Sequence, residues 1–248
     1  MKKIPIKIKL IVFLSFFAAF LWISGQNQDM PVSILTALFS ATLTDSAFSY
    51  FKRRNFSVSS SSVVSALIVG FVLSGGSSPW IIALASLFSV ASKHLICFRG
   101  RHIFNPAAFG VFLSAIFFGA ETGWSGTFLW YILLPAGLYF AYRVARLEVI
   151  AGYALGALGL FGFQALSDNI PLINIFGYLS YFFIFIMLIE PKTTPIRPLA
   201  KVIFGFGVAC LIFVFIQIGS RFDHELAALL VFNISVPLLN RIPERRNL

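Results

Sequence analysis

Apolar residues along this chain come in long runs that are separated by short polar joints. We predict a helix for each run, since a helix needs about 20 mostly apolar residues to cross the hydrocarbon core of a bilayer. Several runs are shorter, and we expect the third to fifth to be broken helices, because neighbouring protein can satisfy backbone groups that lipid cannot. The ten runs are residues 8–24, 31–51, 58–74, 79–96, 105–119, 127–142, 147–166, 171–189, 199–219 and 223–240.

The composition agrees with a lipid environment. Hydrophobic residues make up 58% of the 248 residues and charged residues only 11%, whereas soluble domains carry about 25% charged residues. A water-soluble core of this size could not hide so much apolar surface. The sequence therefore predicts an all-α polytopic membrane protein, with about ten transmembrane helices surrounded by membrane lipid.

The Lys and Arg residues indicate the orientation of the chain. If every run crosses the membrane, all of them except Arg221 fall on one side. Cytoplasmic loops hold Lys and Arg, so this side, with both termini, is expected to be cytoplasmic. The net charge of +10 is then a feature of topology and does not predict nucleic-acid binding. The residues on this side are Lys2, Lys3, Lys7, Lys9, Lys52, Arg53, Arg54, Lys93, Arg99, Arg101, Arg143, Arg146, Lys192, Arg197, Lys201, Arg241, Arg245 and Arg246.

The ten runs divide into two sets of five at about residue 122. Because five is odd, the second set enters the membrane from the opposite side, which is the arrangement of an inverted repeat. We predict repeat 1 over residues 1–122 and repeat 2 over residues 123–248, within a single integral membrane domain. This symmetry needs the first run, so we expect that run to be retained rather than removed as a signal peptide.

Two polar joints on the cytoplasmic side stand out, "FRGRHIFNPAAFG" at 98–110 and "LIEPKTTPIRPLAK" at 188–201. Asn105 before Pro106 is typical of a helix start with an Asn N-cap. Free amide groups at a helix start, together with Arg and His, also favour an anion such as a phosphate or the electron-rich ring of a flavin. Both interpretations stay open. The cofactor-binding candidates in or near the joints are Lys93, Arg101, His102, Asn105, Pro106, Glu190, Lys192, Thr193 and Thr194.

Asp45 lies within the second run, about two helical turns before Lys52. An ionisable residue at membrane depth costs free energy to bury, so Asp45 is a candidate for an ion or proton pathway. The alternative is an Asp that is paired near the cytoplasmic edge. In addition, the serines at 59–62 are expected to cap the third helix, and Gly152, Gly156 and Gly159 suit close helix packing.

Several kinds of site are excluded by what the sequence lacks. The chain has two Cys residues, Cys97 and Cys210, and no C-x-x-C motif, so it cannot assemble an iron–sulfur cluster alone. Its three His residues do not sit at a spacing for haem or for a metal, and we predict neither. There is no dinucleotide-binding fingerprint and no catalytic triad. The chain is therefore not expected to be catalytic alone.

The segment 59–113, "SSSSVVSALIVGFVLSGGSSPWIIALASLFSVASKHLICFRGRHIFNPAAFGVFL", resembles the RnfD/NqrB family. "MLIEPKTTPIRPLAKVIFGFGVACL" at 187–211 is similar to the M-x-x-D-P-x-T-[ST]-P stretch of that family, with Glu190 where Asp is usual. "LLVFNISVPLLNRI" at 229–242 resembles its closing helix. The resemblance implies a ten-helix, two-repeat fold related to urea transporters, in a prokaryotic inner membrane. It also implies electron transfer through flavin, either FMN or riboflavin, beside other subunits of a redox complex.

The same family carries FMN on the Thr of an S-G-A-T motif. The corresponding loop here reads "AETGWSGTFLW", in which Ser125, Gly126 and Thr127 form S-G-T, one residue short. Thr127 is thus a candidate for covalent FMN by resemblance. The alternative is that Ser125 or Thr127 caps the helix that follows.

Three functions stay open from the sequence. The first is a membrane subunit that relays electrons through flavin between partner proteins, with or without coupling to ion translocation. The second is a transporter or channel for a small solute or a flavin, without redox chemistry. The third is an assembly subunit that binds no ligand.

Overall fold

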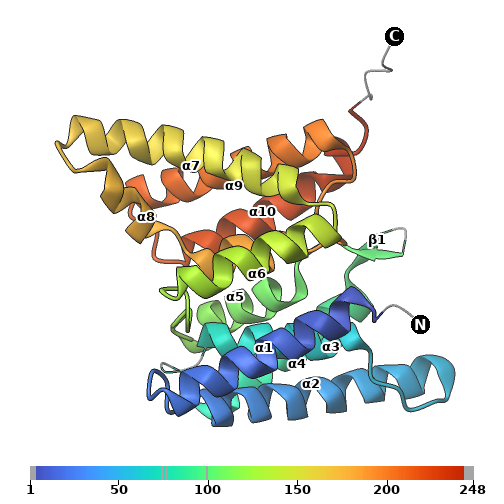
Figure 1. Cartoon of the computed structure of the whole chain (residues 1–248). Coiled ribbons are helices and arrows are strands. Elements are labelled where there is room, and N and C mark those ends of the chain that lie inside the picture. Colours follow the sequence, from blue (N-terminus) through green and yellow to red (C-terminus); the bar gives the residue numbers. More distant parts are fainter. Residues whose placement is uncertain (1–3, 74, 76, 99, 243–248) are drawn as a thin grey trace. The chain divides into compact units, whose positions relative to one another are not determined.

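The computed structural model describes residues 4–73, 75, 77–98 and 100–242 (Figure 1). Within this part of the chain, helices account for almost all of the regular structure. The chain divides into two compact units, Met1–Gly126 and Thr127–Leu248, and each is described here by itself. The inversion of one repeat relative to the other stays a prediction.

Five helices and one short hairpin form unit 1. All five predicted runs of this half are helices, and their ends lie within about two residues of the apolar boundaries, as expected for this kind of prediction. We expected the third to fifth runs to be broken, and this is wrong, because each is one continuous helix that is simply short. The elements are α1 (Ile6–Ile23), α2 (Met30–Arg53), α3 (Ser60–Leu73), α4 (Pro79–Leu95), β1 (Cys97–Phe98), β2 (Arg101–His102) and α5 (Pro106–Phe118).

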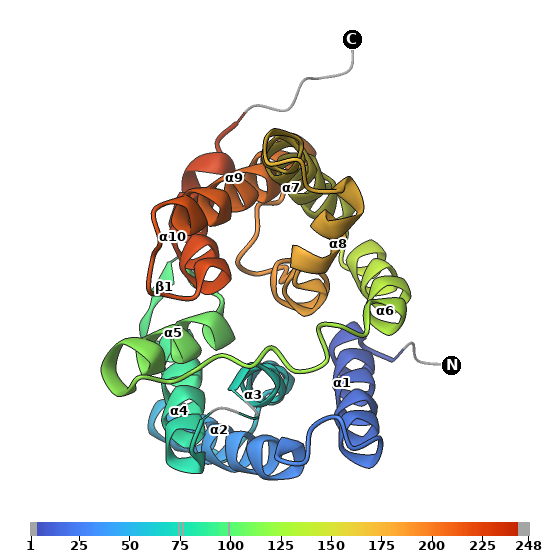
Figure 2. The ribbon, with the colours of Figure 1, turned by 90° about the vertical axis from the view of Figure 1, so that its left-hand side faces the viewer.

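Helix α3 is the inner helix of unit 1. It contacts α1, α2, α4 and α5, which surround it in Figure 2. All of its residues from Ser65 to Leu73 are buried. Gly70 allows α2 to come close, because a Cβ built at Gly70 would lie 2.6 Å from the side chain of Ile34. A helix that is apolar on all sides belongs in such a buried position.

Unit 2 has four longer helices and one interrupted segment. The run at 171–189 does not form the single helix that we predicted. It breaks into a 3₁₀ turn, a four-residue helix and a π-helical turn, with Leu179 to Phe182 between the last two. The elements are α6 (Trp130–Arg143), α7 (Leu147–Ser167), η1 (Leu172–Asn174), α8 (Ile175–Tyr178), η2 (Phe183–Met187), α9 (Pro198–Gln217) and α10 (His224–Leu239).

Helices α7 and α9 form the most extensive contact in unit 2 and lie side by side in Figure 1. Glycines make this contact close. A Cβ at Gly152 would lie 2.1 Å from the carbonyl oxygen of Val202, and a Cβ at Gly205 would lie 2.0 Å from that of Val149. The packing role predicted for Gly152 and Gly156 is confirmed, whereas Gly159 has no atom near its missing side chain.

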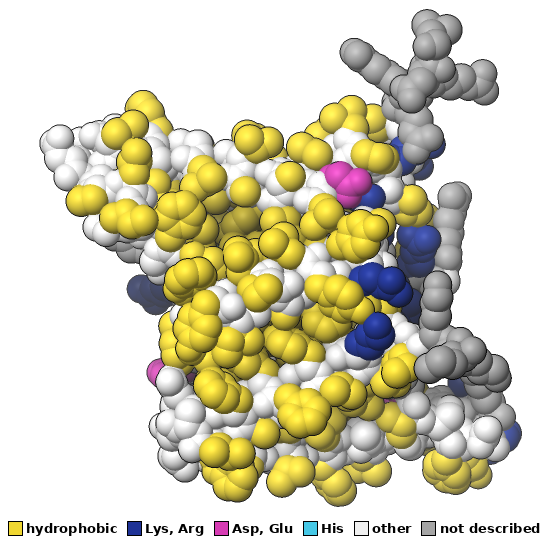
Figure 3. Space-filling model, in the orientation of Figure 1, with side chains coloured by type: hydrophobic (Ala, Val, Ile, Leu, Met, Phe, Trp, Pro, Cys, Tyr) yellow, Lys and Arg dark blue, Asp and Glu magenta, His cyan; other side chains and the backbone are white. Residues whose placement is uncertain are grey.

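The outer surface is that of an integral membrane protein. Helices α1, α2, α7 and α9 are long and apolar enough to cross a bilayer, and four shorter apolar helices accompany them. Large side chains such as Phe16, Phe39 and Phe163 are more than 70% exposed, which in water would be a severe aggregation hazard. Figure 3 shows hydrophobic side chains spread over the visible faces of α1, α6 and α7.

Candidate functional sites

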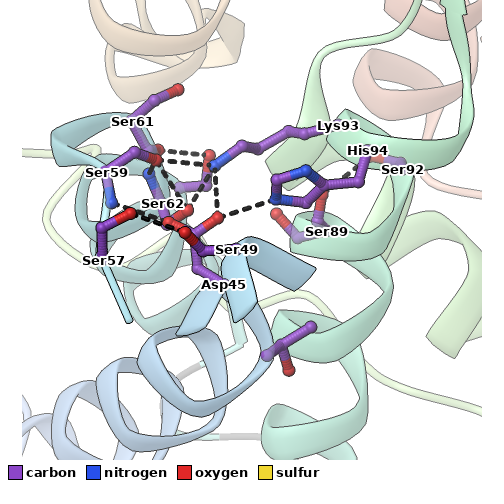
Figure 4. A network of polar contacts seen from close by, with 12 residues as sticks. Asp45, Ser49, Ser57, Ser59, Ser61, Ser62, Ser89, Ser92, Lys93 and His94 are labelled. Atoms are coloured by element: carbon purple, nitrogen blue, oxygen red, sulfur yellow. Dashed lines mark hydrogen bonds and ion pairs between the residues drawn. The ribbon is translucent and has the colours of Figure 1, made fainter. Parts of the chain in front are cut away.

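Asp45 is the centre of a buried polar network in unit 1 (Figure 4). One carboxylate oxygen, Oδ2, accepts a hydrogen bond from the backbone N–H of Ser59 at 2.7 Å. The other, Oδ1, lies 2.8 Å from Nε2 of His94 and 3.8 Å from Nζ of Lys93. The side chains of Asp45 and Lys93 are only 4% and 6% exposed. The predicted pairing of Asp45 is therefore what the structure shows.

Three elements bring this network together, since the start of α3 and the last turn of α4 both contact α2 at Asp45. Asp45 comes from α2, the serines come from the start of α3, and Lys93 and His94 occupy the last turn of α4. Ser59 accepts a hydrogen bond from the N–H of Ser62 at 3.3 Å, so the predicted cap of α3 is confirmed. The Lys93 ammonium donates to the hydroxyls of Ser59 and Ser62. Its donors are engaged inside the protein rather than presented to a cofactor.

His94 occupies the open edge of the same network. Its ring stacks on Phe48 at 4.7 Å between centroids, and its side chain is 21% exposed, against 4% for Asp45. The network therefore joins a partly exposed imidazole directly to a carboxylate that lies within a membrane helix. The role of Asp45 in an ion or proton pathway stays a prediction.

The joint at 98–110 forms a hairpin followed by a capped helix. Cys97 pairs with His102 and Phe98 with Arg101 in an antiparallel register. Asn105 Oδ1 accepts a hydrogen bond from the N–H of Ala108 at 3.1 Å, and Pro106 is the first residue of α5. The helix-cap interpretation of these two residues is thus confirmed. Their role in cofactor binding stays a prediction.

The basic side chains of this joint differ in accessibility. Arg101 is exposed, whereas His102 is only 7% exposed, as neighbours on one strand are expected to differ. Asn105 is 2% exposed. Arg99, which belongs to the same basic group, lies outside the described residues. Of the two described basic side chains, Arg101 is therefore the one that an anion can reach from solvent.

The joint at 188–201 in unit 2 is held by a buried arginine that we did not predict as a site residue. Arg146, 7% exposed, donates from Nε to the hydroxyl of Thr194 at 2.6 Å and from Nη2 to the carbonyl of Pro191 at 3.0 Å. Asn233 of α10 donates to the carbonyl of Thr193 at 3.0 Å. In the sequence, Arg146 served only as one of the basic residues that indicate membrane orientation. No sequence motif indicated a role for Asn233.

These contacts separate the four candidates of the second joint. Thr193 and Thr194 are buried, and their hydroxyls bond to the side chain and the backbone carbonyl of Glu190, respectively. Lys192 is exposed. Glu190, Thr193 and Thr194 therefore act together to shape the loop, while Lys192 is the member that can meet a ligand from outside.

Thr127 does not cap the helix that follows it. The N-cap of α6 is Leu129, without a side-chain cap, so the predicted capping role of Ser125 or Thr127 is wrong. The Thr127 hydroxyl instead donates to Ser180 Oγ at 3.3 Å and accepts from the N–H of Phe182 at 3.4 Å. It thereby satisfies backbone that is freed where the segment 171–189 breaks.

The neighbourhood of Thr127 does not fit a covalently attached FMN. The Thr127 hydroxyl donates its proton to Ser180 Oγ and accepts from the N–H of Phe182. A phosphoester on Thr127 would remove the donated proton and with it a contact that supports the break in the segment 171–189. No step of a mechanism is therefore assigned to a flavin on this residue.

Comparison with known proteins gives two findings. The family described as NQR2, RnfD, RnfE matches residues 2–128 and again residues 112–248. A curated relative from Shewanella amazonensis, which is a component of the ion-translocating oxidoreductase complex of that bacterium, is 30% identical over 131 residues. That alignment covers 51% of this chain and 38% of the relative, so the similar part spans well under half of the relative's length.

Proposed function

Because the chain belongs to the NQR2, RnfD, RnfE family, we propose that it is a membrane subunit of an ion-translocating oxidoreductase complex. In this proposal it relays electrons between partner proteins through a bound flavin. The observation that carries the proposal is the family match over both halves of the chain. The relative from Shewanella amazonensis is named as a component of such a complex, which supports it.

The proposed topology is ten crossings in two inverted repeats, with both termini in the cytoplasm of a prokaryotic cell. The charges of the described residues support it, because Lys52 lies at the end of α2, Lys93 near the end of α4 and Arg143 at the end of α6. Fusion of a periplasmic reporter enzyme after Gly75 or Ser220 should give activity, and fusion after Arg54 or Arg241 should not. The reverse pattern would refute this orientation.

The proposed flavin is held without a covalent bond. Two exposed cations each suit a phosphate or an electron-rich ring: Arg101 before α5 in unit 1 and, independently, Lys192 before α9 in unit 2. The flavin itself would supply the electron transfer. What the chain contributes is charge and position, since Asn105 and Arg146 fix the segments that carry these cations. The basic side would also attract an acidic electron-transfer protein.

Ion coupling is assigned to the network around Asp45. This carboxylate lies within the membrane helix α2, and His94 contacts it from the edge of the network. Intramembrane carboxylates with such partners mark ion and proton routes in membrane proteins. A redox subunit that moves ions needs a group of this kind, which is why the network favours coupling.

A denaturing gel of the purified protein, viewed under ultraviolet light, tests the flavin. We expect a yellow preparation whose colour leaves the protein on denaturation, and whose flavin content falls when Arg101 and Lys192 are both changed to Glu. The matched control is Arg241→Glu, which also reverses a described basic residue. A fluorescent protein band would show a covalent bond and contradict the fit at Thr127. A colourless preparation from the intact complex would refute the electron relay.

The second candidate is a transporter without redox chemistry, and the engagement of Thr127 by Ser180 is the observation that favours it. The cleft of about 670 Å³ in unit 2 does not favour a polar solute, because Trp130, Leu134, Ile173 and other apolar side chains line it. Flux of small neutral solutes into proteoliposomes, measured with a flavin-free preparation, would decide for this candidate.

A further inference from the structure

Among the described residues, three buried serine hydroxyls on α4 and α5 have no hydrogen-bond partner. They belong to Ser86, Ser89 and Ser114, and each of these residues is 0% exposed. A serine inside a helix normally donates to a backbone carbonyl three or four residues earlier. Ser65 and Ser92 in the same unit do so, at 2.9 and 2.7 Å. The three hydroxyls without partners are therefore an exception to a pattern that their neighbours follow.

The packing of the two helices places these hydroxyls in one region. Phe118, the last residue of α5, contacts Trp80 near the start of α4, whereas a Cβ at Gly110 would meet Ser89 near the other end. The helices are therefore antiparallel. Gly110 lies against Ala85 and Ser89 of α4, Ser86 lies between these two residues in the sequence, and Ser114 follows Gly110 by about one turn. Ser86 and Ser114 are therefore within about one turn of each other along the paired helices.

The same face of α4 leads to the Asp45 network. Ser86, Ser89 and Lys93 are spaced by three and four residues, which puts them on one side of a helix. Figure 4 shows Ser89 and Ser92 beside His94. A row of buried polar side chains therefore runs along α4, from the middle of the helix to the carboxylate at its end.

We propose that Ser86, Ser89 and Ser114 form a hydrated site, and that its bound water gives protons a route along α4 to Asp45 and His94. Buried water is found where several polar groups would otherwise be unsatisfied, and it typically makes about three hydrogen bonds. A hydroxyl both donates and accepts, so water and serines can form a continuous chain. This inference does not rest on the electron relay and holds equally for a transporter.

Radical footprinting tests the water directly. Cys97 and Cys210 are first replaced by Ser, and Ser86, Ser89 and Ser114 are then changed to Cys one at a time, a nearly isosteric change. Hydroxyl radicals generated by short X-ray pulses in ¹⁸O water label side chains beside bound water. The matched controls are Val90→Cys and Val111→Cys, because both valines are also 0% exposed and lie on the same two helices.

We expect the serine-site cysteines to be oxidised at least about tenfold faster than the valine-site cysteines, because water is retained only where polar partners hold it. Changing Ser86 and Ser114 together to Val should then slow labelling at Ser89→Cys to the control rate. Equal rates at all five positions would overturn the hydrated site, and so would labelling that survives the double change.

Proteoliposomes test the proton route. A potassium diffusion potential drives proton uptake, which a trapped pH dye reports. We expect the Ser86→Val, Ser114→Val variant to slow uptake by about tenfold, since its proton path lacks the water and hydroxyls. The control is Ser65→Ala, because that hydroxyl is already bonded to the carbonyl of Ser61. The route would be overturned if the unchanged protein takes up protons no faster than protein-free liposomes do. Equal uptake by the Ser86→Val, Ser114→Val variant and by Ser65→Ala would also overturn it.

Discussion

The contact of α2 with α4 in unit 1 and the contact of α7 with α9 in unit 2 hold membrane helices together in two different ways. Both join apolar membrane helices, and both end near a buried lysine that meets a carboxylate. The α2–α4 contact carries polar groups along its length, including a hydrogen bond from Ser40 to the carbonyl of Ala83 at 2.6 Å. The α7–α9 contact carries glycines at which an added Cβ would collide with the opposite backbone.

This contrast distinguishes a contact made by close packing from one that contains polar and charged side chains. In lipid, helices associate through close packing of small residues and through hydrogen bonds. Unit 2 relies mainly on the close packing of glycines at this contact, beside a hydrogen bond from Gln217 to Gln164 at 2.8 Å. Unit 1 relies on charges and hydroxyls, which can also bind protons or water. Scaffolding is therefore assigned to the α7–α9 contact and chemistry to the α2–α4 contact.

The largest effect should come from a larger side chain at Gly205. Its Cβ would lie 2.0 Å from the carbonyl oxygen of Val149, so Gly205→Val forces the two backbones apart. Overpacking typically costs about 1–3 kcal/mol and occasionally more, and a backbone neighbour cannot move aside. We expect no monodisperse protein on size-exclusion chromatography. Gly159→Ala is the control, since nothing lies near that position, and an equal yield from both variants would contradict the scaffold.

The next effect should come from Asp45→Ala. It leaves the Lys93 ammonium buried without its carboxylate, and breaking a buried ion pair in this way costs about 3–5 kcal/mol. Thermal unfolding in detergent should show a marked loss of stability. The double variant Asp45→Leu, Lys93→Met removes both charges and should recover most of it. If the double variant is no more stable than Asp45→Ala, the pair is not what destabilises the single variant.

A smaller effect is expected from Arg146→Lys near the start of α7. The guanidinium reaches Thr194, Pro191 and the carbonyl of Ala145 at once, and a lysine cannot reproduce this fork. Unsatisfied buried groups cost about 1–3 kcal/mol each. Limited proteolysis should cut the 190–197 loop faster in this variant. Lys192→Ala, at an exposed position in the same loop, should leave the rate unchanged; acceleration by both variants would show general loop sensitivity instead.

The smallest effect should come from Glu148→Gln in unit 2. Glu148 lies 3.3 Å from Lys201 but is itself 38% exposed, so solvent screens the pair. Pairs of this kind contribute about 0–1 kcal/mol. The unfolding temperature should therefore change far less than it does in Asp45→Ala. If Glu148→Gln lowers the unfolding temperature as much as Asp45→Ala does, the two lysine–carboxylate pairs contribute equally to stability. That result would contradict the difference between the two helix contacts.

Nine of the ten predicted segments are helices at the expected places, because runs of apolar residues between polar joints allow little else in lipid. The segment 171–189 misled us, since its apolar composition is the same whether the helix is continuous or interrupted. Its break depends on the hydroxyls of Thr127 and Ser180, which satisfy the freed backbone N–H groups. Thr127 is 55 residues away from Phe182, and no local pattern reveals such a partner.

The candidate sites also divide into features that local sequence predicts and features that depend on tertiary packing. The cap formed by Asn105 could be predicted, because its hydrogen bond reaches only three residues ahead. The connection of Asp45 to Lys93 and His94 joins α2 to the end of α4 across 48 and 49 residues, and it depends on how the helices pack. Lys93, which we expected at a cofactor, is drawn inward by the charge of that carboxylate.

Hydropathy and local motifs were enough to identify this chain as a helical membrane protein of the NQR2, RnfD, RnfE family, because both are properties of short segments. Which polar groups meet was settled by the packing of the helices. A buried charge or hydroxyl must find its partner wherever that packing provides one. Asp45 contacts Lys93 and His94, and Arg146 donates a hydrogen bond to Thr194. Thr127 accepts a hydrogen bond from the backbone N–H of Phe182, just before η2.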